Sequence, residues 1–402
     1  MPAPNQCFEA VSDSESDGVI FADGEDDDEP LKVVDCVDLD VGIGGVLSLS
    51  LKCTLRMIEM DIDTAIEAAR GYNLHQACEL CDEMIDYCQK LVKKWATGKS
   101  PKTWTCLLNK RISVSYALKN TALVWLDDKL EQTTMTAALL GGRQLHLPIW
   151  AHAATGDAAA YEEFCSAVRG KVALDEPLVV KPRHGSNSKH VGVWPTPGTA
   201  GETAVLKSVD KALHAMDRTW KKESWNQNAV PHGVVLQPMY APIAGLFDCG
   251  ESSSPIHGRP LELKVQVLFG EVVGCIINTY TPSYVWVSRE GVIHLWDASA
   301  HSFLKRHHGN FEPIPMGVLE LLQDALRRDW LLIRANSEQL ARSAGLDELR
   351  VDWLLGDARW GPRIGETTYM GSFALDMLPA SVLLARAFAT AHLSRRELAG
   401  IG

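Results

Sequence analysis

Hydrophobic residues recur along this chain with two different periods, and each period predicts one kind of element. The clearest helix spans 74–95, where apolar residues lie three and four positions apart on one face and Gly98 can end the helix. We interpret that face as a packing surface. The same spacing predicts further helices at 108–119, 158–168, 202–220, 316–344 and 379–393.

Short apolar runs rich in β-branched residues, bounded by turn residues, predict the strands. Single strands are expected at 122–126, 178–182, 191–194 and 233–240. Antiparallel strands mixed with peripheral helices indicate an α+β fold. Three hairpins are expected, each around a turn that contains glycine: 261–269 with 272–280, 284–287 with 292–296, and 349–355 with 363–368.

The excess of acidic over basic residues lies entirely in the N-terminal part of the chain. The chain has 402 residues, 46% of them hydrophobic, and a formal net charge of −12. Residues 1–40 hold thirteen acidic residues and a single lysine, so the remaining residues balance to zero. We therefore expect a disordered acidic tail at 1–32, followed by a helical or α+β region at 33–170. A neutral body argues against nucleic acid as a partner.

The cysteines and the hydrophobic runs indicate a reduced intracellular protein. Ten cysteines lack the spacing of a disulfide framework, and the pair Cys78 and Cys81 falls at helical spacing on an apolar face. No run is long enough to span a membrane, and the N-terminus lacks the features of a signal peptide. We expect a cytoplasmic protein.

The first chemical constellation is a strand followed by a polar turn. Pro182 favours extended geometry for the residue before it, which places Lys181 on the strand. A glycine-bearing turn presents backbone N–H groups that can surround phosphate oxygens, with the lysine as a neighbouring cation. A surface hairpin with a solvated lysine fits the same residues. The turn consists of His184, Gly185, Ser186, Asn187 and Ser188.

The second constellation is the hairpin of 349–355 with 363–368. A turn centred near Arg359 places Asp352 opposite Glu366 and Arg350 opposite Thr368. Two carboxylates directly opposite each other destabilise a sheet unless a cation such as Mg²⁺ lies between them. An exposed hairpin with a shifted register and two solvated acids is the alternative.

A third polar face lies between these two constellations. Strand alternation over 261–269 places Glu262, Lys264 and Gln266 on one side of the strand. That side either faces solvent or lines a site that holds phosphate and metal. Other schemes are excluded by their motifs, because the sequence contains no G-x-x-x-x-G-K-[ST], no protein-kinase set, no G-x-S-x-G and no H-E-x-x-H.

The order of these segments resembles the ATP-grasp family. A strand lysine before a glycine-serine turn, then VVLQPMY, ELKVQVLFGEVVG and a final D…E-x-T hairpin follow one another as they do in those enzymes. The wording VVKPRHGS and RVDWLLGD is most similar to the ATP-grasp proteins of teichuronic acid biosynthesis, the TupA-like type. The resemblance covers about 175–375. It implies an ATP-grasp domain at 171–402, with the nucleotide held between subdomains of about 171–240 and 241–402.

The resemblance also implies roles for individual residues. Lys181 contacts the nucleotide phosphates and the turn at 184–188 covers them, while Gln237 and Met239 lie beside the adenine. A glutamine stands where the family usually has an acidic residue, and Lys110 is a candidate for the family's first lysine. Glu262 is implied to bind the cofactor and Lys264 and Arg350 to act in catalysis, whereas the implied magnesium ligands are Asp352, Glu366 and Thr368.

Most ATP-grasp enzymes phosphorylate a carboxylate with ATP and let an amine or similar nucleophile attack the acyl phosphate. The resemblance therefore implies an ATP-dependent ligase that uses Mg²⁺ and an unidentified small-molecule or glycan acceptor. A kinase or polysaccharide-modifying transferase of the same fold is a second hypothesis, and a non-catalytic ATP-binding protein a third. Arg289, His294 and the stretch 301–308 form either an anion-binding lip or a solvated basic loop.

Deleting residues 1–30 should leave thermal stability and ATP binding unchanged, because so acidic a segment buries almost no apolar surface. A thermal melt and a nucleotide titration of the truncated protein measure this. A drop of several degrees in melting temperature would contradict a disordered tail.

Overall fold

A computed structural model describes residues 82–97, 104–118, 121–185, 190–215, 229–242, 260–277, 285–295, 316–369 and 379–398. The chain forms two compact units. The first unit comprises the described parts of 119–241 together with 363–366. The second comprises those of 25–118, 242–362 and 367–402. Residues 119–170 thus belong with 171–241, whereas the sequence predicted a boundary at 170.

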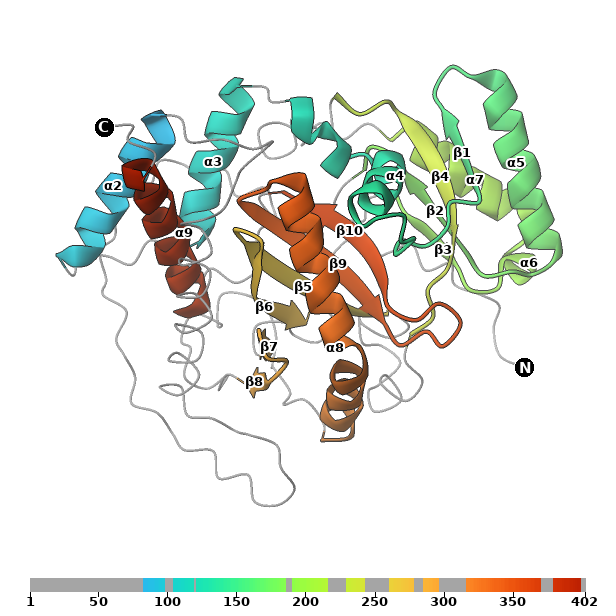
Figure 1. The fold of residues 1–402 in the computed structure, drawn as a ribbon. Helices are drawn as coiled ribbons and strands as arrows, with labels where there is room; N and C mark the ends of the chain where they lie inside the picture. The colour runs from blue at the N-terminus through green and yellow to red at the C-terminus, as the bar shows by residue number, and fades with distance from the viewer. Residues whose placement is uncertain are drawn as a thin grey trace, which may run out of the picture. The chain divides into compact units, whose positions relative to one another are not determined.

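The first unit is built on a four-stranded antiparallel sheet in the order β1-β4-β2-β3 (Figure 1). β1 lies next to β4 because residues 151–154 pair with 233–236, which explains why the segment before residue 171 belongs to this unit. The strands are β1 (Ala151–Ala154), β2 (Leu178–Pro182), β3 (Gly192–Trp194) and β4 (Gly233–Pro238).

Helices pack on this sheet through the apolar faces that the sequence predicted. Phe164 and Val168 of α5 and Val205 and Val209 of α7 are fully buried against strand residues such as Leu178. α7 ends earlier than the predicted 220, and residues 216–228 lie outside the described ranges. The helices of this unit are α4 (Lys129–Leu139), α5 (Ala158–Ala173), α6 (Pro197–Ala200) and α7 (Glu202–Leu213), with the 3₁₀ helix η1 (Thr121–Leu126).

The second sheet has six strands in the order β10-β9-β5-β6-β7-β8. β5 is central, and it pairs antiparallel with both β6 and β9. The three predicted hairpins are confirmed within a few residues at their ends. The strands are β5 (Leu261–Leu268), β6 (Glu271–Ile277), β7 (Val285–Ser288), β8 (Ile293–Leu295), β9 (Glu348–Leu355) and β10 (Arg363–Thr368).

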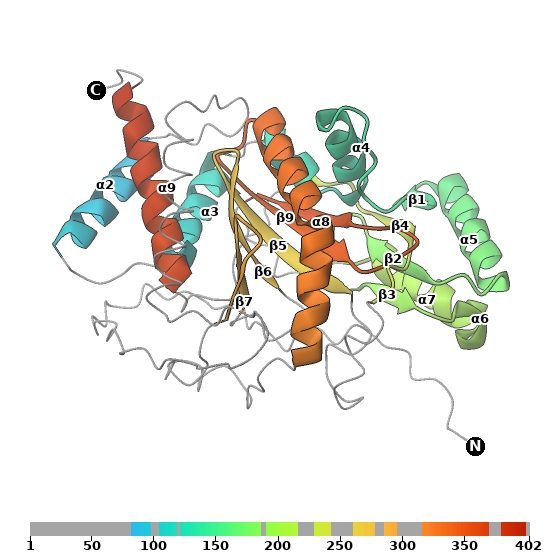
Figure 2. The ribbon, with the colours of Figure 1, turned by 60° about the horizontal axis from the view of Figure 1, so that its bottom comes forward.

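One face of this sheet carries the long helix α8 (Met316–Ala344), as Figures 1 and 2 show. The indole N–H of Trp353 on β9 donates to Ser337 Oγ on α8 at 2.9 Å. Three further helices pack together in this unit: α2 (Asp82–Ala96), α3 (Trp104–Leu118) and α9 (Pro379–Leu398).

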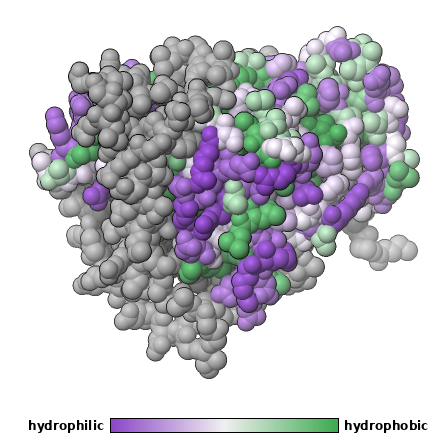
Figure 3. Space-filling model, viewed as in Figure 1, coloured by the Kyte–Doolittle hydropathy of each residue, from purple (hydrophilic) through white to green (hydrophobic). Residues whose placement is uncertain are grey.

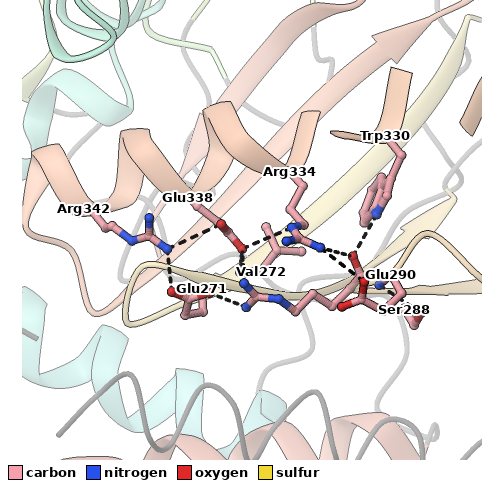
Figure 4. Close-up of polar contacts among 9 residues, drawn as sticks. Glu271, Val272, Ser288, Glu290, Trp330, Arg334, Glu338 and Arg342 are labelled. Carbon is pink, nitrogen blue, oxygen red and sulfur yellow. Dashed lines mark hydrogen bonds and ion pairs between the residues drawn. The ribbon is translucent and has the colours of Figure 1, made fainter. Parts of the chain in front are cut away.

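An ion-pair network ties α8 to the hairpins of the sheet (Figure 4). The carboxylate of Glu338 accepts from the backbone N–H of Val272 at 3.2 Å and pairs with Arg289 at 3.0 Å. Burial raises the pKa of Glu338 above its ordinary value. Arg289, which was expected either in an anion-binding lip or in a solvated basic loop, also pairs with Glu271 and so belongs to this network. The side chain of His294 and residues 301–308 lie outside the described residues.

One prediction made from a short apolar run differs from the structure. Residues 122–126 form the helix η1 and not a strand, because the run leads directly into the Asp128 cap of α4. The strand β1 and the helix α4 were not predicted. The acidic tail, and Cys78 with Cys81, lie outside the described residues. The predicted α+β class is confirmed.

Hydrophobic and hydrophilic areas alternate on the face drawn in Figure 3. Leu331 and Leu332 of α8 are among the exposed large hydrophobic residues, at 75% and 44% exposure. None of the described helices is both long and apolar enough to cross a membrane.

A buried ion pair joins α3 to the start of β9. Arg111 donates to Asp347 at 2.9 and 3.1 Å, and His392 of α9 lies 3.0 Å from the same carboxylate. Arg111 is 1% exposed and Asp347 fully buried. Burial alone would raise the pKa of Asp347, but Arg111 and His392 outweigh it and hold the pKa below its ordinary value.

Replacing Arg111→Met should destabilise the protein by about 3–5 kcal/mol, since it leaves a buried carboxylate without its cation. Arg111→Met combined with Asp347→Asn should recover part of that loss. Urea unfolding of the two variants measures the difference. Equal destabilisation in both would show that packing, and not charge, accounts for the effect.

Candidate functional site

Lys181 lies on β2, as its place before Pro182 predicted. Its Cα is paired with Val235 of β4, and its side chain is partly buried. Burial first, and the nearby Lys129 second, lower the pKa of Lys181 to about 8, while Glu366 opposes them. A lysine whose cationic form is disfavoured by its surroundings is typical of a site that binds an anion.

Lys129, which sequence reasoning missed, is the second cation of this site. It is the first residue of α4, and its ammonium donates to the carbonyl of Gly185 at 2.8 Å and to Glu366 at 3.3 Å. The side chain is 13% exposed. The local sequence signal for the helix that begins at Lys129 is Asp128, a residue type that often caps helices. The residues after it have no clear hydrophobic period, so no helix was predicted there.

His146 holds the segment that carries Glu366. The backbone N–H of Ile364 donates to Leu145 O at 2.8 Å, and His146 forms a parallel bridge with Ile364. The ring Nε2 lies 3.3 Å from Thr136 Oγ. Burial first, and Lys181 second, lower the pKa of His146 to about 3. A hydrogen bond with the Ile364 backbone acts in the opposite direction and raises the pKa. The imidazole is therefore neutral at physiological pH and supports the site without adding charge to it.

The side chain of His184, in the turn predicted to cover a nucleotide, is directed into the protein. The ring is fully buried, stacks on His232, lies 2.9 Å from Ala215 O through Nε2, and accepts from Gly233 N–H at Nδ1. Both ring nitrogens thus bond to the protein, and burial lowers the pKa. Gly185 is buried, with its carbonyl bound by Lys129. Ser186, Asn187 and Ser188 lie outside the described residues.

The two residues predicted beside adenine lie at the end of β4. Gln237 is buried, and its amide donates to the carbonyl of Leu147 at 3.2 Å. The backbone N–H of Met239 donates to Pro177 O at 3.1 Å, while its side chain is partly exposed. The amide of Gln237 thus binds the backbone at Leu147. The contact of Gln237 and Met239 with adenine stays a prediction.

In the second unit, Arg350 and Asp352 form a buried bidentate pair. Arg350 Nε and Nη2 lie 2.7 and 2.9 Å from the two carboxylate oxygens. Lys264 on β5 is opposite Asp352, and its ammonium lies 3.9 Å from the carboxylate. Arg350 also donates to Thr368 Oγ at 3.4 Å, which agrees with the predicted pairing of those two positions.

These contacts correct the idea of an uncompensated carboxylate pair in the metal-free protein. Asp352 is paired with Arg350, and Glu366 with Lys129. Within the described ranges, no group of three or more His, Cys, Asp or Glu residues is arranged to hold a metal. Carboxylate and hydroxyl oxygens remain the donors that Mg²⁺ prefers, so the residue types of Asp352, Glu366 and Thr368 fit that ion.

The remaining candidates occupy less specific places. Glu262 is partly exposed on β5, opposite Leu354 of β9. Lys110 lies on α3 and pairs with Glu83 of α2, a contact between helices within the second unit. Lys129 lies near Lys181, whereas Lys110 binds Glu83, so the role suggested for Lys110 stays a prediction.

No protein-family model matches the sequence, and the search of curated proteins finds no match. Among solved structures, D-cycloserine synthetase DcsG is similar with a TM-score of 0.36 and 17% identity, over 84% of this chain and 95% of that chain. The ATP complex of D-alanine–D-alanine ligase from Bacillus anthracis is similar with a TM-score of 0.34 and 12% identity, over 89% of this chain and 96% of that chain. The ATP-grasp ligase PsnB with its minimal precursor is similar with a TM-score of 0.30 and 13% identity, over 65% of this chain and 59% of that chain. Likeness at this level carries no information about a substrate.

The affinity for a nucleotide should fall as the pH rises through about 8, because Lys181 loses its proton there. Its cationic form costs folding stability below that pH, a cost that disappears between the folded pKa and the ordinary value near 10.5. Titrations of a fluorescent ATP analogue between pH 6.5 and 9.5 measure the effect, with Lys181→Arg as the variant that should lack it. An identical pH profile in both proteins would contradict the assignment.

Proposed function

We propose that this chain is a magnesium- and ATP-dependent enzyme of the ATP-grasp fold. In the proposed reaction, a carboxylate is activated as an acyl phosphate and ligated to an amine or a similar nucleophile. The observation that carries the proposal is the convergence of Lys129 and Lys181 around the carboxylate of Glu366 in the described part of the first unit. Two ammonium groups held together at a cost to stability favour a polyanionic ligand such as a nucleotide phosphate.

The proposal is supported by how the local sequence builds this site. β2 supplies one lysine, the N-terminus of α4 the other, and the segment at 363–366 the carboxylate. These segments are far apart in sequence, so their convergence is a property of the fold and not of a single loop. The order of motifs that resembles the ATP-grasp family is a second, independent support.

Each residue then has a proposed role. Lys129 and Lys181 bind phosphate oxygens and neutralise charge that develops on the transferred phosphoryl group. Arg350 and Lys264, two cations of the second unit, take the same role there. Bound ATP and magnesium supply the phosphoryl group and its charge-neutralising cation, with the metal held by Asp352, Glu366 and Thr368.

ADP release with a library of paired carboxylates and amines tests the proposal. Lys181→Ala and Lys129→Ala should each weaken binding or turnover roughly ten- to a hundredfold, the usual effect of removing one charge-assisted hydrogen bond. Lys171→Ala is the matched control, since this lysine stacks on Trp150 in the same unit and lies outside the proposed site. Unchanged nucleotide affinity in both site variants would show that the lysines are structural.

Arg350→Gln should have opposite effects on metal binding and on turnover. The guanidinium bonds to both oxygens of Asp352, so we expect it to compete with a cation for this carboxylate. Removing the guanidinium should therefore strengthen binding of Mn²⁺ in the absence of nucleotide, while it slows ADP release. Electron paramagnetic resonance of Mn²⁺ measures the first effect independently of activity.

Asp352→Asn is the comparison variant, and it should lose the metal affinity that Arg350→Gln gains. Equal Mn²⁺ binding by wild type and Arg350→Gln would rule out competition between the guanidinium and the metal.

A further inference from the structure

The first turn of α4 is joined to the residues after β2 by a pair of side chains that no proposed contact with a ligand uses. Arg183 Nε lies 2.8 Å from Asp128 Oδ1, and its Nη2 lies 2.5 Å from Oδ2. The exposed fractions are 13% for Arg183 and 3% for Asp128. Such a shielded, bidentate geometry distinguishes the pair from surface ion pairs, which contribute little.

The same two residues are also joined through the backbone. Asp128 caps α4 by accepting from the N–H groups of Leu130 and Glu131, and the N–H of Lys129 donates to Arg183 O at 3.2 Å. These three bonds satisfy the first N–H groups of the helix. The helix terminus therefore has no N–H in its first turn to offer an anion, and α4 acts on a ligand only through the ammonium of Lys129.

Arg183 is in turn fixed to the sheet, because its N–H donates to Gly233 O at 2.8 Å at the start of β4. Lys181 lies two residues earlier on β2, and Gly185, which accepts from the Lys129 ammonium, two residues later. Any displacement of Arg183 relative to Asp128 therefore moves Lys129 relative to both Lys181 and Gly185.

We propose that Asp128 and Arg183 are positioning residues, which set the place of the Lys129 ammonium beside Lys181. The inference rests on the proposed function for its consequence, the affinity for a nucleotide, but not for the geometry itself. Neither residue touches the ligand. The fork of the guanidinium is required, because lysine presents a single point charge and cannot bond both carboxylate oxygens in this fixed geometry.

Chemical labelling of lysines tests the geometry without any nucleotide. Limited acetylation followed by mass spectrometry gives the reaction rate of Lys129, which should rise roughly tenfold in Arg183→Lys, as expected when one charge-assisted hydrogen bond is lost. Asp128→Asn should give the same result, and asparagine still caps the helix, so the variant tests the pair and not the cap. Arg169→Lys is the matched control, since Arg169 pairs with Glu162 and Glu202 at the surface of the same unit.

A double-mutant cycle tests the consequence. Arg183→Lys should weaken binding of a fluorescent ATP analogue roughly tenfold in the wild-type background. In the Lys129→Ala background it should have no further effect, because the pair acts through that lysine. Additive effects would overturn the proposal, as would an unchanged labelling rate of Lys129 in both variants of the pair. Increased labelling together with no nucleotide binding in wild type would leave the pair in place and overturn the proposed function instead.

Discussion

The burial of one ammonium group beside a second is the constraint on which the first unit depends. Among the described residues, Lys129 and Lys181 both lie near the carboxylate of Glu366, whose charge does not restore the pKa of Lys181 to its ordinary value. The fold therefore holds an excess of positive charge in partly buried surroundings. An anion with several oxygens would offset this charge, which is the physical argument for the phosphate site proposed above.

In the second unit, the buried and partly buried arginines are paired with carboxylates. Arg350 is matched by Asp352, Arg111 by Asp347, and the arginines next to α8 by Glu271 and Glu338. Each of these cations is balanced by a carboxylate of the same unit. In the proposed function, a metal would compete with an arginine of this unit for its carboxylate, and a phosphate would compete with the carboxylate for its arginine.

How far the sequence predicts this molecule depends on whether a signal is local. Pro182 fixes the backbone before it, so the place of Lys181 on a strand follows from its neighbours. Hairpins follow in the same way from alternation and turn residues. The roles of His184 and Gln237 do not, because the buried partners of their side chains, Ala215 and Leu147, are set by tertiary packing. Lys129 carries no motif, and only the approach of α4 to residue 185 gives it a role.

The neutral state of His146 connects these parts. A protonated imidazole beside Lys181 would add a third positive charge, and the same lysine that the site requires is one of the two influences that keep the ring neutral. The neutral ring lies against Thr136 of α4 and hydrogen-bonds to the backbone of Ile364, two residues before Glu366. Glu366 in turn binds the ammonium of Lys129. The charge of one lysine thus helps to hold in place the carboxylate that positions the other, so the site is a mutually dependent set and not a sum of separate contacts.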